Sequence, residues 1–368
     1  MSLRERLKST TQKSPQHDPY RRFGVLANPF PPASQTAGHP HNPSAADDEI
    51  ANRIENFINE KRSQVVVVEG TQGVGKTNLL NHWEIEIKDA LGEIDGYYVI
   101  RYLADPEASF DSTLRRLFQE LGVDFIEKLG KALAAKKEAI DDARNPEMRT
   151  AMRRLAEKPG DRSRAMLFRD WLLGIRILKS HREELDIQFR LDTVESKTGA
   201  LRDVVIVSSR VKLLEGIFLL LDELEKQSGV LGATAVVRYL SALRAIIDAL
   251  PQHLFMMLAV TPDAMIRYSA ALPAFRSRLL NPIMLQPLDS EDKALDLARF
   301  YVKHAKEQAE KSQGNAPAGT EELLSDDAIK AVFQELRRTS ERRADVGVRQ
   351  REFLHALHDK ADAVIAEI

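Results

Sequence analysis

The sequence predicts an α/β fold, a three-layer αβα sandwich in which a parallel β-sheet lies between layers of helices. Two observations lead to this expectation. Short apolar runs alternate along the chain with longer segments of helical composition, which is typical of β-α-β units. The clearest run, Val65–Val68, is followed by a glycine-rich turn and the amphipathic segment Thr77–Ile87. A run of β-branched residues without polar alternation indicates a strand buried on both faces.

The turn after this strand has the pattern Gly-x-x-x-x-Gly-Lys-Thr, which indicates binding of ATP or GTP. Glycines permit positive φ and let backbone N–H groups approach anionic oxygens, while the start of the next helix adds its positive dipole end. The lysine can reach the β- and γ-phosphates, and the threonine hydroxyl can ligate Mg²⁺. A plain glycine turn is the alternative. The candidate nucleotide-binding residues are Gly70, Thr71, Gln72, Gly73, Val74, Gly75, Lys76, Thr77 and Asn78.

A second apolar strand, Gly216–Leu221, ends in two adjacent carboxylates, Asp222 and Glu223. Because side chains alternate along a strand, the two acids diverge and can serve different purposes. Asp222 is the candidate Mg²⁺ ligand together with Thr77, and Glu223 is the candidate base that orients or deprotonates the attacking water. The alternative is a helix start with an Asp cap and a first-turn Glu.

Two further elements follow the acid pair. A third buried strand ends at Thr261, whose hydroxyl is a candidate partner for the attacking water or the γ-phosphate. Arg276 and Arg278 then precede the short apolar run Ile283–Leu285. These arginines are either catalytic or members of surface salt bridges.

The phosphate loop is followed by the strand that ends in two acids, the strand that ends at Thr261 and the segment with two arginines. In this order of motifs the chain resembles the AAA+ ATPases, nearest their initiator and transposon-regulator branches. The resemblance implies self-assembly into a ring or filament and hydrolysis of ATP with Mg²⁺. It implies that Thr261 is sensor 1 and that Arg276 or Arg278 is an arginine finger acting on a neighbouring subunit. A sensor 2 arginine is expected in the tail, where Arg349 opens the last helix and Arg342, Arg343 and Arg351 compete for the role.

The expected organisation is an extended N-terminal arm over residues 1–46, an ATPase core over 47–289 and a helical lid over 290–368. A helical insertion is expected within the core at about 109–215, because Leu, Ala, Lys, Glu and Arg dominate there. The arm contains the apolar stretch Phe23–Phe30. In related ATPases a similar stretch passes the adenine base, and the alternative is that it simply packs on the core.

The insertion contains a basic segment, Arg144–Arg169, with eight basic and three acidic residues. This segment is the candidate contact for double-stranded DNA, and a solvated helix face is the alternative. The stretch Phe168–Gly174, followed by a helix and the Asp-Glu strand, is also similar to ATP-binding proteins of bacterial phage-defence islands of the BREX type. That similarity implies a motor or switch in a defence complex.

Composition limits the partners. The net charge of −2 gives no global basic field, so a protein partner is expected at least as much as DNA. No apolar stretch approaches the ~18 residues of a membrane span, and the chain has no cysteine, which suits the cytoplasm. Two functions stay open: an ATPase that remodels or licenses a partner complex, and a regulatory nucleotide switch that acts on a protein without DNA.

Overall fold

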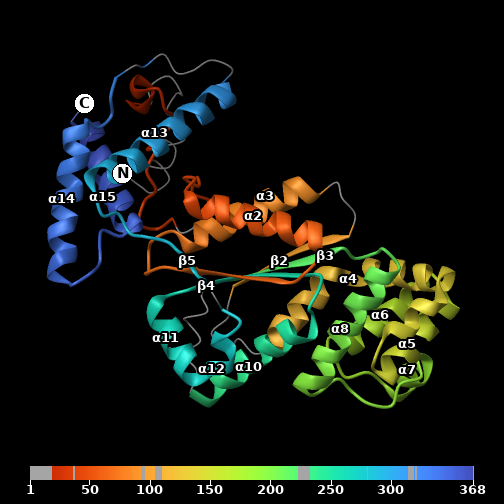
Figure 1. Ribbon diagram of the computed structural model, residues 1–368. Coiled ribbons are helices and arrows are strands. Elements are labelled where there is room, and N and C mark those ends of the chain that lie inside the picture. Colours follow the sequence, from red (N-terminus) through yellow and green to blue (C-terminus); the bar gives the residue numbers. More distant parts are fainter. Residues whose placement is uncertain are drawn as a thin grey trace, which may run out of the picture. The chain divides into compact units, whose positions relative to one another are not determined.

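The computed structural model describes residues 19–35, 38–92, 96–103, 110–222, 233–279, 281–313, 319 and 321–367. Within these residues the chain forms two compact units (Figure 1). The larger unit comprises residues 44–70 and 79–284. The smaller one comprises the described parts of 1–43, 71–78 and 285–368. The phosphate loop therefore belongs to the same unit as the C-terminal helices.

A parallel β-sheet is the centre of the larger unit and confirms the predicted fold class. In the described residues the strand order is β2-β3-β4-β1-β5, and each neighbouring pair is parallel. The carboxyl ends of the strands therefore lie at one edge of the sheet, where open α/β sheets bind their ligands. The strands are β1 (Gln64–Glu69), β2 (Tyr97–Leu103), β3 (Gly216–Asp222), β4 (Leu254–Val260) and β5 (Ile283–Met284).

One helix directly precedes β1, and the other helices connect the strands. They are α2 (Ala45–Glu60), α3 (Lys76–Leu91), α4 (Phe110–Ala135), η3 (Lys137–Asp142), α5 (Pro146–Glu157), α6 (Arg162–Leu172), α7 (Lys179–Leu185), α8 (Val194–Arg210), α10 (Ala233–Ala249), α11 (Pro262–Ala271) and α12 (Pro273–Arg276). No helix in the described part of the chain is long and apolar enough to cross a membrane.

The central strands are buried because helices cover both faces of the sheet. Every residue of β3 and β4 is buried. Phe218 and Phe255 face α2, where Phe57 contacts their rings at centroid distances of 5.2 and 5.7 Å. Since side chains alternate, Leu219 lies on the opposite face, in the core that includes Leu243 of α10. Figure 1 shows α2 and α3 over one face and α10 over the other, which gives the three layers.

Between β2 and β3 the chain forms a group of helices, α4 to α8, joined by short turns. The long helix α4 changes direction at Gly122, where φ is +73° and ψ is 178°. Asn145 caps α5 by accepting the N–H groups of Glu147 and Met148, as expected for an Asn before a helix. Trp171 of α6 is buried and donates its indole N–H to the carbonyl oxygen of Phe189 at 3.1 Å.

The smaller unit has its own hydrophobic core. Its helices are η2 (Pro19–Phe23), α13 (Glu291–Gln313), α14 (Asp326–Arg342) and α15 (Gln350–Ala366). Phe23 and Phe30 are buried in this core with Phe333 and Phe353. Asn28 donates to Asp362 of α15 at 2.8 Å. The apolar stretch near the N-terminus thus packs on the C-terminal helices. A place beside the adenine base stays a prediction.

Candidate functional site

The phosphate loop joins β1 directly to α3. Gly73 and Gly75 have φ of +83° and +101°, which L side chains rarely adopt. A Cβ at Gly75 would lie 3.2 Å from the Oε1 atom of Gln350, a tight contact, and the positive φ favours glycine here in any case. Gly70 does not share the positive φ. Its N–H donates to the Val260 carbonyl oxygen at 3.2 Å and extends the pairing of β1 with β4.

Lys76, the first residue of α3, is held close to the loop. Its side chain is almost fully buried, with 7% exposed, and the ammonium group donates to the Thr71 carbonyl oxygen at 3.1 Å. Thr77 follows in the first turn of the helix, half-buried. Asn78 donates from Nδ2 to the Pro40 carbonyl oxygen at 3.1 Å. The loop thus presents a cation and a hydroxyl at the start of a helix, which is the arrangement that binds phosphates.

The first residues of α15 lie against the phosphate loop within the smaller unit. The N–H of Arg351 donates to the Gly73 carbonyl oxygen at 3.1 Å. A Cβ at Gly73 would lie 3.5 Å from the Cβ of Arg349, the N-cap of α15. The positive end of a second helix therefore stands beside the loop.

The structure separates the four arginines considered for sensor 2. Arg349 and Arg351 lie beside the loop. Arg343 is ion-paired with Glu352 at 3.1 Å, and Arg342 is an exposed residue at the end of α14. The guanidinium of Arg349 pairs with Asp345 at 3.3 Å and with Glu352 at 3.5 Å. Arg349 is thus positioned next to the loop, with its charge shared by two acids of its own chain.

Two histidines surround Arg351 on the same side of the smaller unit. Burial, and to a lesser extent the positive charge of Arg351, lower the pKa of His39; a hydrogen bond to the Gln35 backbone opposes this. Burial and then Arg351 also lower the pKa of His355. Both rings therefore favour the neutral form more than a free imidazole does, beside the charged Arg351.

Asp222 is the last residue of β3 and only 1% exposed. Its Oδ2 atom accepts a hydrogen bond from Nη2 of Arg101, on the neighbouring strand β2, at 2.7 Å. The side chain of Arg101 is itself only 11% exposed. Two buried charges therefore pair near the carboxyl ends of β2 and β3.

Thr261 follows the end of β4 and caps α11. Its hydroxyl oxygen accepts the N–H of Ala264 at 3.3 Å. The capping bond uses one lone pair of the hydroxyl, which keeps its proton available as a donor. Glu223, the candidate base, lies outside the described residues.

The two candidate finger arginines differ in their surroundings. Arg278 is ion-paired through Nε with Asp248 of α10 at 2.9 Å, and the same carboxylate pairs with Arg244 at 3.2 Å. Arg276, the last residue of α12, is exposed, and it forms no ion pair with the described residues. Arg278 therefore has an ion-pair partner in its own chain, and Arg276 has none among the described residues.

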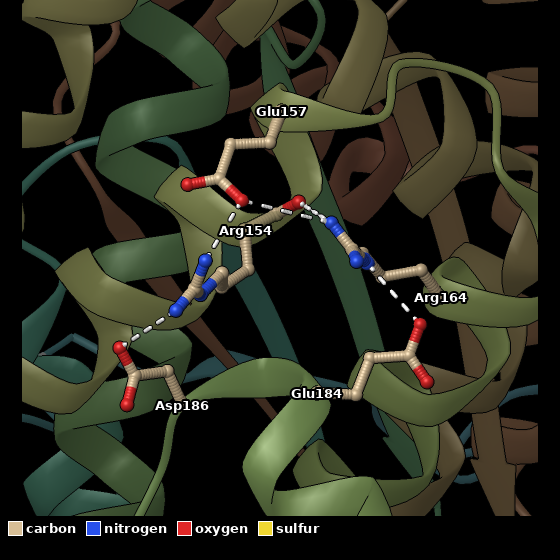
Figure 2. Close-up of polar contacts among 5 residues, drawn as sticks. All are labelled: Arg154, Glu157, Arg164, Glu184 and Asp186. Carbon is tan, nitrogen blue, oxygen red and sulfur yellow. Dashed lines mark hydrogen bonds and ion pairs between the residues drawn. The ribbon is translucent and has the colours of Figure 1, made fainter.

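The basic segment is mostly neutralised. Figure 2 shows Arg154 of α5 between Glu157 and Asp186, at 3.0 and 3.2 Å, and Arg164 of α6 reaching Glu184 at 3.5 Å. Arg164 is buried and also donates to the Arg154 carbonyl oxygen. The ion pairs of the remaining paired residues are Arg153 with Asp141, Arg162 with Asp124 and Glu127, and Arg169 with Asp170.

Most of these acids lie outside the counted segment, so the local excess of positive charge in the sequence is not a positive surface in the fold. Among the described residues, only three basic side chains of the segment form no ion pair, namely Arg144, Arg149 and Lys158. These ion pairs agree with a solvated helix face, and contact of the segment with double-stranded DNA stays a prediction.

The residues of the loop fit a nucleoside triphosphate with Mg²⁺. The two positive-φ glycines leave room that a Cβ would fill, and Lys76 supplies the cation. Thr77 of the loop offers a hydroxyl oxygen, a hard ligand of the kind that Mg²⁺ prefers. In the larger unit, Asp222 offers a carboxylate oxygen of the same kind.

Sequence reasoning missed two features of the site. Arg101 is the one charged residue in the strand Tyr97–Leu103. A charge inside a buried strand predicts an ionic partner, and this signal was present in the sequence. The contact of Gln350 with the loop had no such signal in the local pattern of α15, whereas the resemblance names Arg349 and Arg351 as candidates for sensor 2.

The parallel sheet and the phosphate loop after β1 give the chain an α/β fold of the P-loop NTPase type. Among solved structures, the chain is similar to the Aeropyrum pernix ORC2 protein in its ADPNP–ADP complexes, with a TM-score of 0.44, 12% identity and coverage of 91% of this chain and 72% of that one. For the ADP form the TM-score is 0.41 at 13% identity, with coverage of 92% and 73%. No protein-family model matches the chain, and no curated protein matches it significantly. The function is therefore inferred from the chain's own residues.

Proposed function

We propose that the chain is an ATP-hydrolysing subunit of the AAA+ class, which assembles with copies of itself and uses turnover to remodel or license a partner complex. The partner implied by the resemblance is of a mobile-element or phage-defence kind. The observation that carries the proposal is the phosphate loop, in which two positive-φ glycines and the buried ammonium of Lys76 stand at the N-terminus of α3.

Each residue of the site has a proposed task. The loop N–H groups and Lys76 bind the phosphates, with Arg349 or Arg351 beside the loop as the second cation. Thr77 and Asp222 hold Mg²⁺, which neutralises charge on the phosphates when bound. Glu223 orients the attacking water and accepts its proton, and the Thr261 hydroxyl donates a hydrogen bond to that water or to the γ-phosphate.

Lys76→Ala tests nucleotide binding. Removing a charge-assisted contact of about 1.5–3 kcal/mol is expected to weaken ATP binding at least about tenfold, as measured by calorimetry. Lys88→Ala is the matched control. It removes a lysine of the same helix whose side chain is exposed and pairs only with Glu84 in the described structure. Equal ATP affinity of Lys76→Ala and the parent protein would remove the basis of the proposal.

A second function, a nucleotide switch that acts on a protein partner without DNA, is favoured by the neutralised basic segment. Only Arg144, Arg149 and Lys158 lack an ion pair with the described residues there. These three could contribute a slope of about −2.7 in a plot of log affinity against log salt, whereas eight exposed cations would give about −7.

The salt dependence of binding to a DNA duplex, followed by fluorescence anisotropy, distinguishes these values. We expect this segment to contribute a slope no steeper than about −2.7. The triple variant Arg144→Ala, Arg149→Ala, Lys158→Ala should remove this contribution to the salt dependence. A slope near −7 that the triple variant leaves in place would show that the ion pairs open on DNA. That result would favour the ATPase that remodels a partner complex on DNA over the nucleotide switch that acts without DNA.

A further inference from the structure

We propose that Arg101 is a positioning residue for the Mg²⁺ site: from β2 it holds the Asp222 carboxylate in the orientation in which Asp222 binds the metal. This inference rests on the proposed function, since it assigns a role to Arg101 in the same site. Neither the motif pattern nor the resemblance pointed to this residue.

The sheet itself brings the two side chains together. β2 and β3 are parallel neighbours in which Arg101 lies opposite Leu220 and Leu103 opposite Asp222. In β3, Phe218 packs on Phe57 of α2. Because side chains alternate, Asp222 lies on this same face, and the Arg101 guanidinium reaches it along the sheet rather than across it. The register, which is fixed by the buried apolar residues, therefore also fixes this pair.

Both partners of the ion pair between Arg101 and Asp222 are buried. Asp222 is 1% exposed and Arg101 11% exposed, so either charge would be strongly destabilising if its partner were removed. The hydrogen bond from Nη2 to Oδ2 at 2.7 Å fixes the orientation of the carboxylate. Groups that orient a metal ligand typically contribute about 10- to 100-fold to metal affinity.

The experiment uses Mn²⁺ as the probe, because its binding to the protein–ADP complex can be followed by electron paramagnetic resonance without any turnover. Arg101→Met is expected to lower Mn²⁺ affinity by about 10- to 100-fold. ADP affinity measured in EDTA should stay at the parent value. Arg116→Met is the control, since Arg116 is an exposed arginine of α4 that pairs with Glu120, and it should leave both quantities unchanged.

A purely structural role for Arg101 would lower the melting temperature of the metal-free protein and leave Mn²⁺ affinity at the parent value, which would overturn the inference. If Arg101→Met does not fold, Arg101→Lys takes its place, because an ammonium keeps the charge but loses the planar geometry of the guanidinium. Parent-like Mn²⁺ affinity in Arg101→Lys would then overturn the inference, and a reduced affinity would support it. Failure of the proposed function is distinguishable, because in that case the parent protein itself binds neither ADP nor Mn²⁺.

Discussion

Arg276→Ala is expected to lower ATP hydrolysis by about 10³-fold, the amount that a guanidinium delivered to the transition state supplies. Arg278→Ala, the matched control, should change it little. Arg278 is held by Asp248 of its own chain at 2.9 Å, whereas Arg276 is exposed at the end of α12 and forms no ion pair with the described residues. ATP binding should be retained in both variants, because neither residue belongs to the phosphate loop.

Complementation tests whether the active site is shared between subunits. Arg276→Ala chains keep an intact phosphate loop, and Lys76→Ala chains keep the arginine. A mixture should therefore regain activity that neither variant has alone. Specific activity of the parent protein should also fall on dilution, because assembly depends on concentration. Activity that stays constant over about a hundredfold dilution, together with an inactive mixture, would indicate a monomeric switch.

Glu223→Gln is expected to retain ATP and to lose hydrolysis by about 10²-fold or more, the contribution of a general base. Gln keeps the shape of the side chain but cannot accept the proton from water. The measurement is a single-turnover assay beside an ATP-binding isotherm, and the variant should also accumulate the ATP-bound assembly in size-exclusion chromatography. Undiminished turnover would leave Glu223 as a first-turn helix acid and move the catalytic role to another residue.

The strands and the phosphate loop could be predicted because their signals are local. Val66, Val67 and Val68 are buried on both faces of the sheet, as a β-branched run indicates. The glycines and the lysine of the loop occur in one short motif whose residue types each have a physical reason. The αβα layers follow from the same alternation of apolar runs and helical segments.

The features that could not be predicted depend on contacts between distant segments. Arg101 and Asp222 are 121 residues apart, and only the order of the strands makes them neighbours. Arg154 is neutralised by Asp186, which lies 32 residues further along the chain and outside the basic segment Arg144–Arg169. Sequence alone likewise did not distinguish Arg276 from Arg278, because the acid that pairs with Arg278 comes from α10.

The hydrogen bond from Arg351 to the Gly73 carbonyl oxygen has a consequence for the order in which the protein matures. The ribosome releases the phosphate loop long before it releases α15, and domains fold progressively as the chain emerges. A nascent chain therefore carries a loop whose support at Gly73 has not yet been synthesised. Competence to retain nucleotide is expected to come late in synthesis, after α15 has docked, so an unfinished chain is a poor competitor for cellular ATP.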